Sequence, residues 1–371
     1  MRVVMFCHSL LSDWNHGNAH FLRGVCDELR RRGHVVDVYE PAGAWSLANL
    51  VAEHGIAPIE AFHRAYPGLT SHVYDAATFD LDAALDAADV VLVHEWNEPA
   101  LVRRIGAHRR GGGRYRLLFH DTHHRAVSER DAIAGYDLDG YDGVLAFGEA
   151  IRERYLREGW SHAAWTWHEA ADTRRFRPLP NVARAADLAW IGNWGDEERS
   201  RELHEFVLDP ARALRLSGTI HGVRWPDGAR AAAADAGLDY RGWLANFDAP
   251  AVFARHRVTV HVPRRPYVEH LPGIPTIRPF EALACAIPLV CAPWRDSEGL
   301  FRPGRDYLVA EDGAAMQRHL RALLDDAGMA HELAANGLET VRARHTCVHR
   351  VDELLAIVAA LGTHTAERET A

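Results

Sequence analysis

The segment 272–291 has residue types and spacing suited to binding a nucleoside diphosphate. It reads Pro-Gly-Ile-Pro-Thr-Ile-Arg-Pro-Phe-Glu-Ala-Leu-Ala-Cys-Ala-Ile-Pro-Leu-Val-Cys, a Gly/Pro loop that leads into a short helix. A helix N-terminus offers free N–H groups and a partial positive charge to anionic oxygens. We expect Thr276 to cap this helix and Arg278 to make forked contact with phosphate. Glu281 lies off the apolar stripe of the helix, so its carboxylate faces either the ribose hydroxyls of a ligand or solvent.

Two further loops in the second half of the chain carry candidate ligand contacts. Gly192 and Asn193 follow a predicted strand, and three acids come soon after them at 196–198. Because those acids would repel phosphate at their own helix end, we expect contact there through the backbone and Asn193. Arg264 and Arg265 stand between two prolines and form either a diphosphate contact or a solvated surface turn.

In the first half of the chain, polar residues follow two predicted strands. His120 stands beside Asp121 where one strand ends, and a histidine there can act as a general acid or base near neutral pH. The alternative is an ordinary histidine, since the chain has 24. A metal site is disfavoured, although one Asp and three His lie at 120–124, because ligands adjacent in sequence point in divergent directions. Glu95, after the other strand, is a candidate base or a simple loop carboxylate.

The loop at 8–20, after the first strand, is long and contains one glycine, Gly17. It therefore lacks the Gly-x-Gly-x-x-Gly fingerprint of dinucleotide binding, and we interpret it as the wall of a cleft between domains. Arg23, on the following helix, has no acid in the first turn beside it and could face an anion. Trp14 and Trp96 are suited either to stacking on an acceptor or to packing in the fold.

These loops must be positioned by an alternation of short strands and helices. Near-continuous apolar strands separated by helices predict an α/β fold with parallel sheets buried on both faces. Ligands bind beyond the carboxyl ends of such strands, which is where the candidate residues lie. The expected strands are Val3–Cys7, Val35–Tyr39, Asp89–His94, Arg116–His120, Asp142–Phe147, Asp187–Gly192, Ala213–Ile220, Val258–Val262, Ile287–Cys291 and Tyr307–Val309.

A Pro- and Arg-rich stretch at 172–180 separates two series of strands and is typical of a linker. We predict two Rossmann-like domains, at 1–175 and 186–345. The last helical run, within 346–371, is expected to cross back to the N-terminal domain and to end in a polar tail from Gly362.

Composition excludes several classes of protein. A chain of 371 residues exceeds one hydrophobic core, and a net charge of −9 argues against nucleic-acid binding. There is no apolar run long enough for a transmembrane helix, and the N-terminus is typical of a strand rather than a signal peptide. The five scattered cysteines fit thiols in a reducing cytoplasm. All 42 basic residues are Arg, which excludes Lys chemistry and which we attribute to a GC-rich genome.

These segments also resemble a known family. The run Phe-Glu-Ala-Leu-Ala-Cys-Ala-Ile-Pro at 280–288 resembles the Phe-Glu-Ala-Leu-Ala-Cys-Gly-x-Pro segment of GT-B glycosyltransferases, most closely the group related to the spore-maturation protein CgeB. Residues 169–178 are similar to the family's Asn-Gly-Val-Asp-x-x-x-Phe-x-Pro linker, and 141–150 to the strand, turn and helix before it. The resemblance spans nearly the whole chain and is strongest at 276–291.

The resemblance implies roles for individual residues. Glu281 would contact the donor ribose, His120 would lie near the donor sugar, and the loop 240–244 would hold the nucleobase. The chain departs from the family at Gly273, where many retaining enzymes have a second Glu, and at Asn193, where one of two basic residues is usual. Possible replacements for the basic pair are Arg199, Arg224, Arg264, Arg265 and Arg278.

The predicted site has three groups of residues and no metal ligands. The expected catalytic residues are His120, Asp121 and Glu281. The expected donor-binding residues are Gly17, Asn193, Arg224, Trp243, Leu244, Arg264, Arg265, Gly273, Thr276, Ile277, Arg278 and Glu281. The expected acceptor-binding residues are Trp14, His20, Glu95 and Trp96.

We therefore expect a cytoplasmic, bacterial glycosyltransferase of the hexosyltransferase type that acts in carbohydrate biosynthesis. Its C-terminal domain would bind a nucleoside-diphosphate sugar, expected to be a UDP-sugar. Its N-terminal domain would bind an acceptor that is a small molecule, a glycan or a polypeptide. No cofactor or metal is expected, because arginines and backbone amides would neutralise the leaving diphosphate.

The stereochemical course is open. In a retaining enzyme His120 would orient the donor sugar, whereas in an inverting enzyme His120, His20 or Glu95 would be the base. Two alternative functions remain: a nucleotide-sugar 2-epimerase of the same fold, and a non-catalytic protein that binds a nucleotide sugar or glycan.

Overall fold

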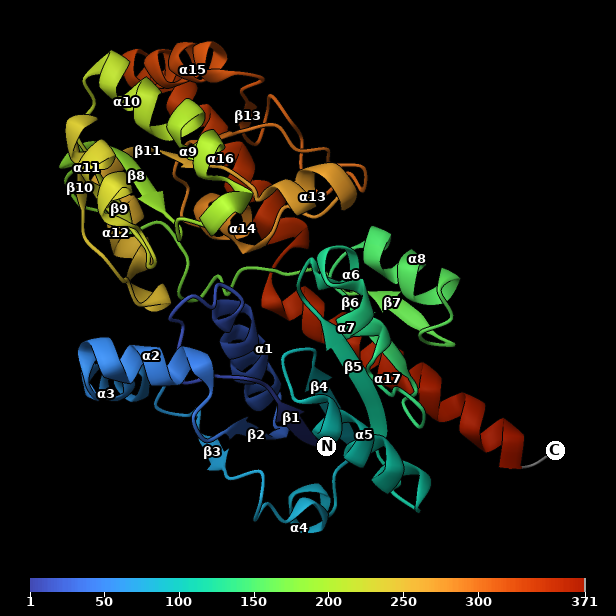
Figure 1. Ribbon diagram of the computed structural model, residues 1–371. Coiled ribbons are helices and arrows are strands. Elements are labelled where there is room, and N and C mark those ends of the chain that lie inside the picture. Colours follow the sequence, from blue (N-terminus) through green and yellow to red (C-terminus); the bar gives the residue numbers. More distant parts are fainter. Residues whose placement is uncertain (370–371) are drawn as a thin grey trace. The chain divides into compact units, whose positions relative to one another are not determined.

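The computed structural model describes residues 1–369 and divides into two compact units (Figure 1). Unit 1 comprises Met1–Glu169 together with the segment from Cys347 onward, and unit 2 comprises Ala170–Thr346. Each unit is built on its own parallel sheet. The expected α/β class with two parallel sheets is therefore confirmed.

Unit 1 contains a seven-stranded sheet in the order β3-β2-β1-β4-β5-β6-β7, with every pair parallel. The strands are β1 (Arg2–Phe6), β2 (Val35–Pro41), β3 (Ser71–Tyr74), β4 (Val90–His94), β5 (Arg116–Asp121), β6 (Gly143–Ala146) and β7 (Ala164–Thr166). The helices are α1 (Ala19–Arg31), α2 (Trp45–His54), α3 (Ala57–Ala65), α4 (Leu81–Leu85), α5 (Pro99–Arg110), α6 (Arg125–Ser128), α7 (Arg130–Ala134), α8 (Glu149–Arg157) and α17 (Cys347–Glu369). Strand β4 is buried along its whole length, as its five-residue run Val-Val-Leu-Val-His requires at the centre of a covered sheet.

Unit 2 contains a six-stranded parallel sheet in the order β10-β9-β8-β11-β12-β13. The strands are β8 (Ala186–Ile191), β9 (Gly218–His221), β10 (Leu238–Tyr240), β11 (His256–His261), β12 (Leu289–Cys291) and β13 (Leu308–Val309). The α-helices are α9 (Ser200–Leu203), α10 (Asp209–Leu214), α11 (Asp227–Asp235), α12 (Ala249–Arg255), α13 (Arg265–His270), α14 (Ile277–Ala284), α15 (Gly313–Asp325) and α16 (Ala327–Arg344). Three shorter helical segments are η1 (Asp196–Glu198), η2 (His204–Leu208) and η3 (Asn246–Asp248).

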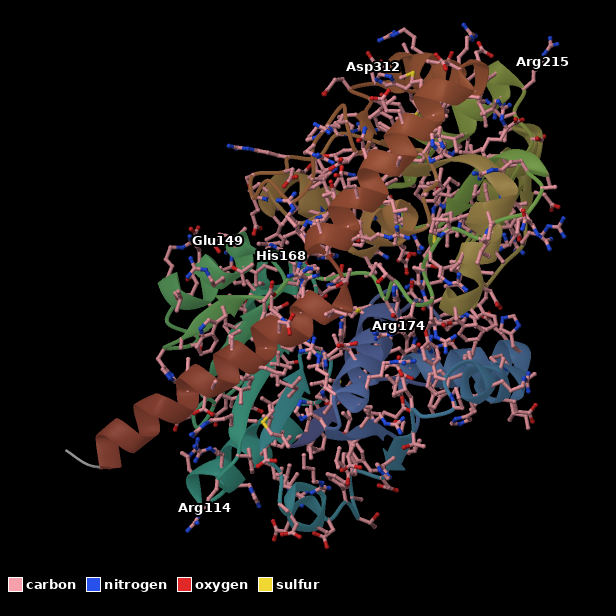
Figure 2. All side chains as sticks on the ribbon, turned by 180° about the vertical axis from the view of Figure 1, so that it is seen from behind. Arg114, Glu149, His168, Arg174, Arg215 and Asp312 are labelled. Atoms are coloured by element: carbon pink, nitrogen blue, oxygen red, sulfur yellow. The ribbon has the colours of Figure 1, made fainter. Side chains whose placement is uncertain are left out.

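Local chemistry sets several helix ends in unit 2. Asp312, labelled in Figure 2, caps α15 by accepting a hydrogen bond from the backbone N–H of Ala315 at 2.6 Å. Asp326 caps α16 in the same way through Met329. The strand that we expected at Ala213–Ile220 is wrong in its first half, because α10 continues to Leu214 and β9 begins only at Gly218.

Helix α17 belongs to unit 1 and lies against α1, which confirms the expected return of the last helix to the N-terminal domain (Figure 1). Arg32 pairs with Asp352 at 2.5 Å, and the indole N–H of Trp167 donates to the carbonyl of Arg350 at 2.8 Å. The helix continues through Glu369, into the segment that we expected to be a polar tail, and residues 370–371 of that tail lie outside the described residues.

Candidate functional site

The loops that leave the carboxyl ends of β8, β9 and β10 in unit 2 are tied together by three glycines. The N–H of Gly222 donates to the carbonyl of Gly242 at 2.8 Å. Gly222 has φ of +151°, and a Cβ there would stand 1.9 Å from the carbonyl oxygen of Gly192, so only glycine fits. Asn193 also serves this junction, because its side-chain Oδ1 accepts a hydrogen bond from the N–H of Val223 at 2.9 Å.

Arg199 crosses this edge of the sheet and lies among other arginines. It donates to the carbonyl of Val262 at 3.0 Å and to that of Asn193 at 2.5 Å. Burial, followed by the positive charges of Arg264 and Arg278, lowers the pKa of its guanidinium to about 9. Three cations therefore gather beside the strand ends of β8 and β11, and one of them is destabilised in its charged form.

The other predicted arginines pair with the acids at 196–202. Arg264 contacts Glu198 at 2.6 Å, Arg265 contacts Glu202 at 3.1 Å, and Arg224 contacts Asp196 at 3.1 Å. We expected the acids at 196–198 to repel phosphate, but the ion pairs of Asp196 and Glu198 screen part of their charge. Arg199 makes no ion pair of this kind among the described residues, because its polar partners are carbonyl oxygens.

The loop before α14 has a strained backbone. Thr276 has φ of +60° and ψ of −178°, a region that is essentially restricted to glycine and costs about 1–3 kcal/mol for other residues. Its side chain makes no capping hydrogen bond, so the prediction that Thr276 caps α14 is wrong. Ile277 is 7% exposed and packs in the core, which leaves its backbone for any ligand contact. Strain of this kind is often retained where a backbone must present N–H groups in a fixed geometry.

Glu281 is fully buried and forms an ion pair with Arg278, one turn earlier on α14. We expected Arg278 to face phosphate and Glu281 to face ribose or solvent. The solvent-facing alternative is wrong, because the carboxylate of Glu281 has no exposed surface. The predicted phosphate contact of Arg278 and the predicted ribose contact of Glu281 therefore depend on each other. A phosphate that attracts Arg278 would weaken its ion pair with Glu281.

A second carboxylate lies against the loop at Gly273. This glycine has φ of +92°, and a Cβ there would stand 2.5 Å from Oε1 of Glu298. The space beside position 273 is therefore filled by the side chain of Glu298, from the loop after β12. The sequence offered no signal for this arrangement.

His261 ends β11 at the same edge and was not among the predicted residues. Burial, followed by the charges of Arg199 and Arg278, lowers its pKa to about 3, so the ring is neutral at physiological pH. The ring hydrogen-bonds the backbone of Pro275, and its Nε2 is buried without a partner. A buried, unpartnered acceptor or donor beside an arginine cluster is typical of a ligand contact.

The loop after β10 contains the residues expected to hold a nucleobase. Gly242 has φ of +72°, and Trp243 and Leu244 are both half-buried. Leu244 packs on the cluster that includes Phe253 and Phe280. The loop thus lies at the same edge as the arginine cluster, with its backbone fixed by the contact between Gly222 and Gly242.

In unit 1, His120 and His94 meet at the carboxyl edge of the sheet. They are paired residues in the register of β4 and β5, and their Nδ1 atoms lie 2.9 Å apart. Burial lowers the pKa of His94 to about 3 and also lowers the pKa of His120. Both rings are therefore neutral at physiological pH.

Asp121 and Glu95 form a buried pair of carboxyl groups beside these histidines. Burial raises the pKa of Asp121 to about 6, and burial together with the charge of Asp121 raises the pKa of Glu95. The Tyr155 hydroxyl donates to Asp121 at 2.8 Å, and the Thr122 N–H donates to Glu95 at 3.2 Å. Such a pair retains a proton near neutral pH, which disfavours Glu95 as a base.

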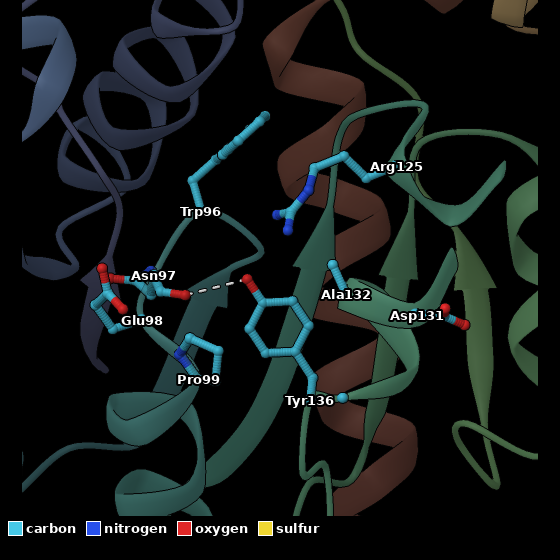
Figure 3. Close-up of a pocket in the computed structure, with 9 residues that line it drawn as sticks. Trp96, Asn97, Glu98, Pro99, Arg125, Asp131, Ala132 and Tyr136 are labelled. Carbon is cyan, nitrogen blue, oxygen red and sulfur yellow. Dashed lines mark hydrogen bonds between the residues drawn. The ribbon is translucent and has the colours of Figure 1, made fainter. Parts of the chain in front are cut away.

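The loop after β4 borders a pocket of about 430 Å³ (Figure 3). The guanidinium of Arg125 lies over the ring of Trp96 at 4.7 Å, and Trp96 is 42% exposed. Tyr136 closes one side and donates a hydrogen bond to the carbonyl of Asn97 at 3.1 Å. The remaining lining residues include two carboxylates, Glu98 and Asp131. A pocket with an exposed indole and both signs of charge is suited to a polar acceptor.

The loop after β1 is stabilised by buried side chains that hydrogen-bond to it. Arg23 is fully buried and donates to the carbonyl of Leu10 at 2.9 Å and to Asp13 at 2.7 Å, so the idea that it faces an anion is wrong. Trp14 is also buried, and its indole N–H donates to Glu53 at 2.8 Å. His20 is buried on α1, whereas Gly17 is exposed.

No group of three or more His, Cys, Asp and Glu side chains within the described residues is arranged to hold a metal ion. No helix in the described part of the chain has both the length and the apolar character needed to cross a bilayer.

Part of the second half of the chain is similar to a known family. Residues 199–356 match a family described as glycosyl transferase-like. A search of curated protein sequences finds no significant match.

Solved structures with the same fold cover almost the whole chain. Sucrose-phosphate synthase from Thermosynechococcus elongatus is 15% identical with a TM-score of 0.65, over 98% of this chain and 100% of that one. The Anabaena protein HepE, in complex with UDP and glucose, is 13% identical with a TM-score of 0.67, over 97% and 99%. An alpha-glucosyltransferase in complex with UDP-glucose and DNA is 12% identical with a TM-score of 0.68, over 97% and 99%. The chain therefore has the GT-B fold of two Rossmann-like units, and residues 199–356 are similar to the glycosyl transferase-like family.

Proposed function

We propose that this protein is a glycosyltransferase that transfers a sugar from the nucleoside diphosphate UDP to a polar acceptor without a metal ion. The observation that carries the proposal is the convergence of Arg199, Arg264 and Arg278 beside the loop that begins α14. The charged form of Arg199 is disfavoured in the free protein, and a diphosphate would supply the missing negative charge.

In this proposal unit 2 binds the donor. The diphosphate contacts the arginines and the N–H groups at the start of α14, and the nucleoside contacts Glu281 and the loop of Trp243 and Leu244. The arginines replace the divalent cation that would otherwise neutralise the leaving group, so catalysis rests on electrostatic stabilisation of developing phosphate charge. Structural relatives with the same fold were solved with UDP or UDP-glucose, which supports the choice of base and of a hexose.

Unit 1 contributes His120 and the acceptor pocket. A neutral His120 hydrogen-bonds a hydroxyl of the donor sugar or of the acceptor. The acceptor occupies the pocket beside Trp96 and Arg125, where an indole face and polar groups are accessible. The mixed charge of this pocket favours a hydroxyl-rich small molecule or glycan over an acceptor with a strong net charge.

The experiment is a panel of UDP, GDP, ADP and dTDP with their common sugars, measured by thermal unfolding and calorimetry with and without EDTA. Selective stabilisation by one nucleotide that EDTA leaves unchanged is the expected result. If no nucleotide stabilises the protein, or if stabilisation requires a divalent metal, the donor site is assigned wrongly.

A non-catalytic sugar-nucleotide binding protein is the second candidate. It is favoured by Asn193, whose side chain is used in a loop contact, and by the lack of a side chain at Gly273. Slow hydrolysis of the bound donor by the pure protein would exclude this candidate. Interconversion of the sugar without loss of the nucleotide would instead indicate the epimerase.

A further inference from the structure

His94 and His120 are placed in contact by the sheet itself. They are directly paired in the parallel register of the neighbouring strands β4 and β5. Residues paired in this way direct their side chains to the same face of the sheet. Their rings are 4.5 Å apart at an interplanar angle of 64°, and the two Nδ1 atoms are 2.9 Å apart. This separation is that of a hydrogen bond and is too short for two nitrogens that both lack, or both carry, a proton.

The two rings share no other polar partner among the contacts described. His120 is fully buried, His94 is 3% exposed, and the Nε2 atom of each is buried without a hydrogen bond. The rings of Phe21 and Trp167 lie 6.1 Å and 4.8 Å from that of His120 and limit its rotation. The Nδ1 atoms therefore hydrogen-bond each other, whereas the Nε2 atoms make no hydrogen bond among the described residues.

A neutral imidazole carries one proton on one of its two nitrogens. If His120 donates from Nδ1, its Nε2 is a bare acceptor, and His94 must then carry its proton on Nε2. If His94 donates from Nδ1, the two assignments are exchanged. One Nε2 of the pair is thus always a donor while the other is an acceptor, and neither tautomer can change alone.

We propose that His94 is a positioning residue that couples the tautomer of His120 to its own through the hydrogen bond between their Nδ1 atoms. The Nε2 atom of His120 then offers a sugar or acceptor hydroxyl the hydrogen-bonding character opposite to that of the His94 Nε2. This catalytic consequence rests on the proposed function, whereas the coupled tautomers do not.

The direct test uses the whole protein with ¹⁵N-labelled histidine and no substrate. Long-range ¹H–¹⁵N correlation at pH 7.5 identifies the protonated nitrogen of each ring, with assignments from His94→Asn and His120→Asn. We expect one ring protonated on Nδ1, the other protonated on Nε2, and a scalar coupling between the two Nδ1 nuclei. The same tautomer in both rings, or a charged ring at this pH, would overturn the proposal.

Three variants test the positioning role. His94→Leu removes the partner of His120, whereas the side-chain amide of His94→Asn can place a polar atom near the original Nδ1. The control is His108→Asn on α5, where the histidine Nδ1 lies 3.0 Å from the Tyr115 hydroxyl and makes no described contact with the pair. Thermal unfolding of each variant verifies that it folds.

With an active donor, His94→Leu should lower kcat by roughly tenfold or more, the effect of one lost hydrogen bond, with little change in KM. His94→Asn should recover most of this loss, and His108→Asn should resemble wild type. Equal losses in His94→Leu and His94→Asn would indicate packing and would refute the positioning role. If the wild-type protein turns over no donor, the proposed function fails while the tautomer measurement still decides the pairing.

Discussion

Replacing Arg199 by Met tests whether this arginine binds a ligand or stabilises the fold. The pKa of its guanidinium falls from its ordinary value to about 9, which corresponds to an upper limit of about 5 kcal/mol of destabilisation of the charged form in the free protein. The true penalty is smaller, because part of the side chain reaches solvent. Arg199→Met removes this penalty, but it also removes two hydrogen bonds to carbonyl groups, worth roughly 1–3 kcal/mol together.

The two effects nearly cancel, so the melting temperature should stay within about 6 °C of wild type. Nucleotide binding should weaken by roughly 10- to 100-fold, because a charged hydrogen bond to phosphate contributes about 1.5–3 kcal/mol. Calorimetric titration with UDP and thermal unfolding measure the two quantities on the same samples.

The matched control is Arg257→Met. Arg257 belongs to the same unit, pairs with Asp187 at 3.3 Å and is 42% exposed at the amino end of β11. This variant should bind UDP like wild type. The reasoning is refuted if Arg199→Met lowers the melting temperature strongly while UDP affinity is unchanged, because Arg199 would then be structural.

Three further predictions follow from the same contacts. Glu281→Gln should weaken UDP binding by roughly 10- to 100-fold. Its affinity for pyrophosphate, which has no ribose, should stay within about threefold of wild type, and equal losses for both ligands would contradict a ribose contact. Gly273→Ala should weaken nucleotide binding more than Gly299→Ala, because both glycines have positive φ but only a Cβ at 273 meets a neighbouring side chain; equal affinities in titration would argue against this. The pKa of His94 is about 3 in the folded protein and about 6.5 unfolded, so the unfolded chain binds more protons below pH 6.5. The free energy of unfolding should therefore decrease as the pH falls from 6.5 toward 3, by up to about 1.4 kcal/mol per pH unit for each such histidine. The raised pKa of Asp121 partly offsets this loss between pH 6 and 4. In thermal melts between pH 7.5 and 5, wild type should lose more stability than His94→Asn, and equal losses would refute the assignment.

The sequence was sufficient for the parallel α/β class because buried strands leave a local signal. Runs such as those at 90–93 and 117–119 are apolar throughout, and a sheet covered on both faces accommodates them. Strands β3, β7 and β10 were missed because they are short and only partly buried, so their apolar pattern is weak. Their positions depend on pairing with β2, β6 and β9, which is long-range information.

The candidate site was only partly predictable, because residue types indicate chemistry but not partners. The sequence indicated His120 but could not reveal that its neighbour is His94, which is 26 residues away on another strand. Arg23 has the residue type of an anion contact, yet loop carbonyls and Asp13 occupy its donors. Partners of this kind are fixed by register and loop geometry, for which one sequence gives no direct signal.

Helix α17 makes unit 2 an insertion within unit 1 in the order of synthesis. The ribosome produces α1 and the sheet of unit 1 first, then about 180 residues of unit 2, and only then the helix that packs on α1. At roughly 5–20 residues per second, unit 1 waits about 9–36 s for its last helix. During that interval the face of α1 that α17 later covers is exposed to water and chaperones, although α1 was made at the start. Unit 2, begun later, is complete in sequence before unit 1 is.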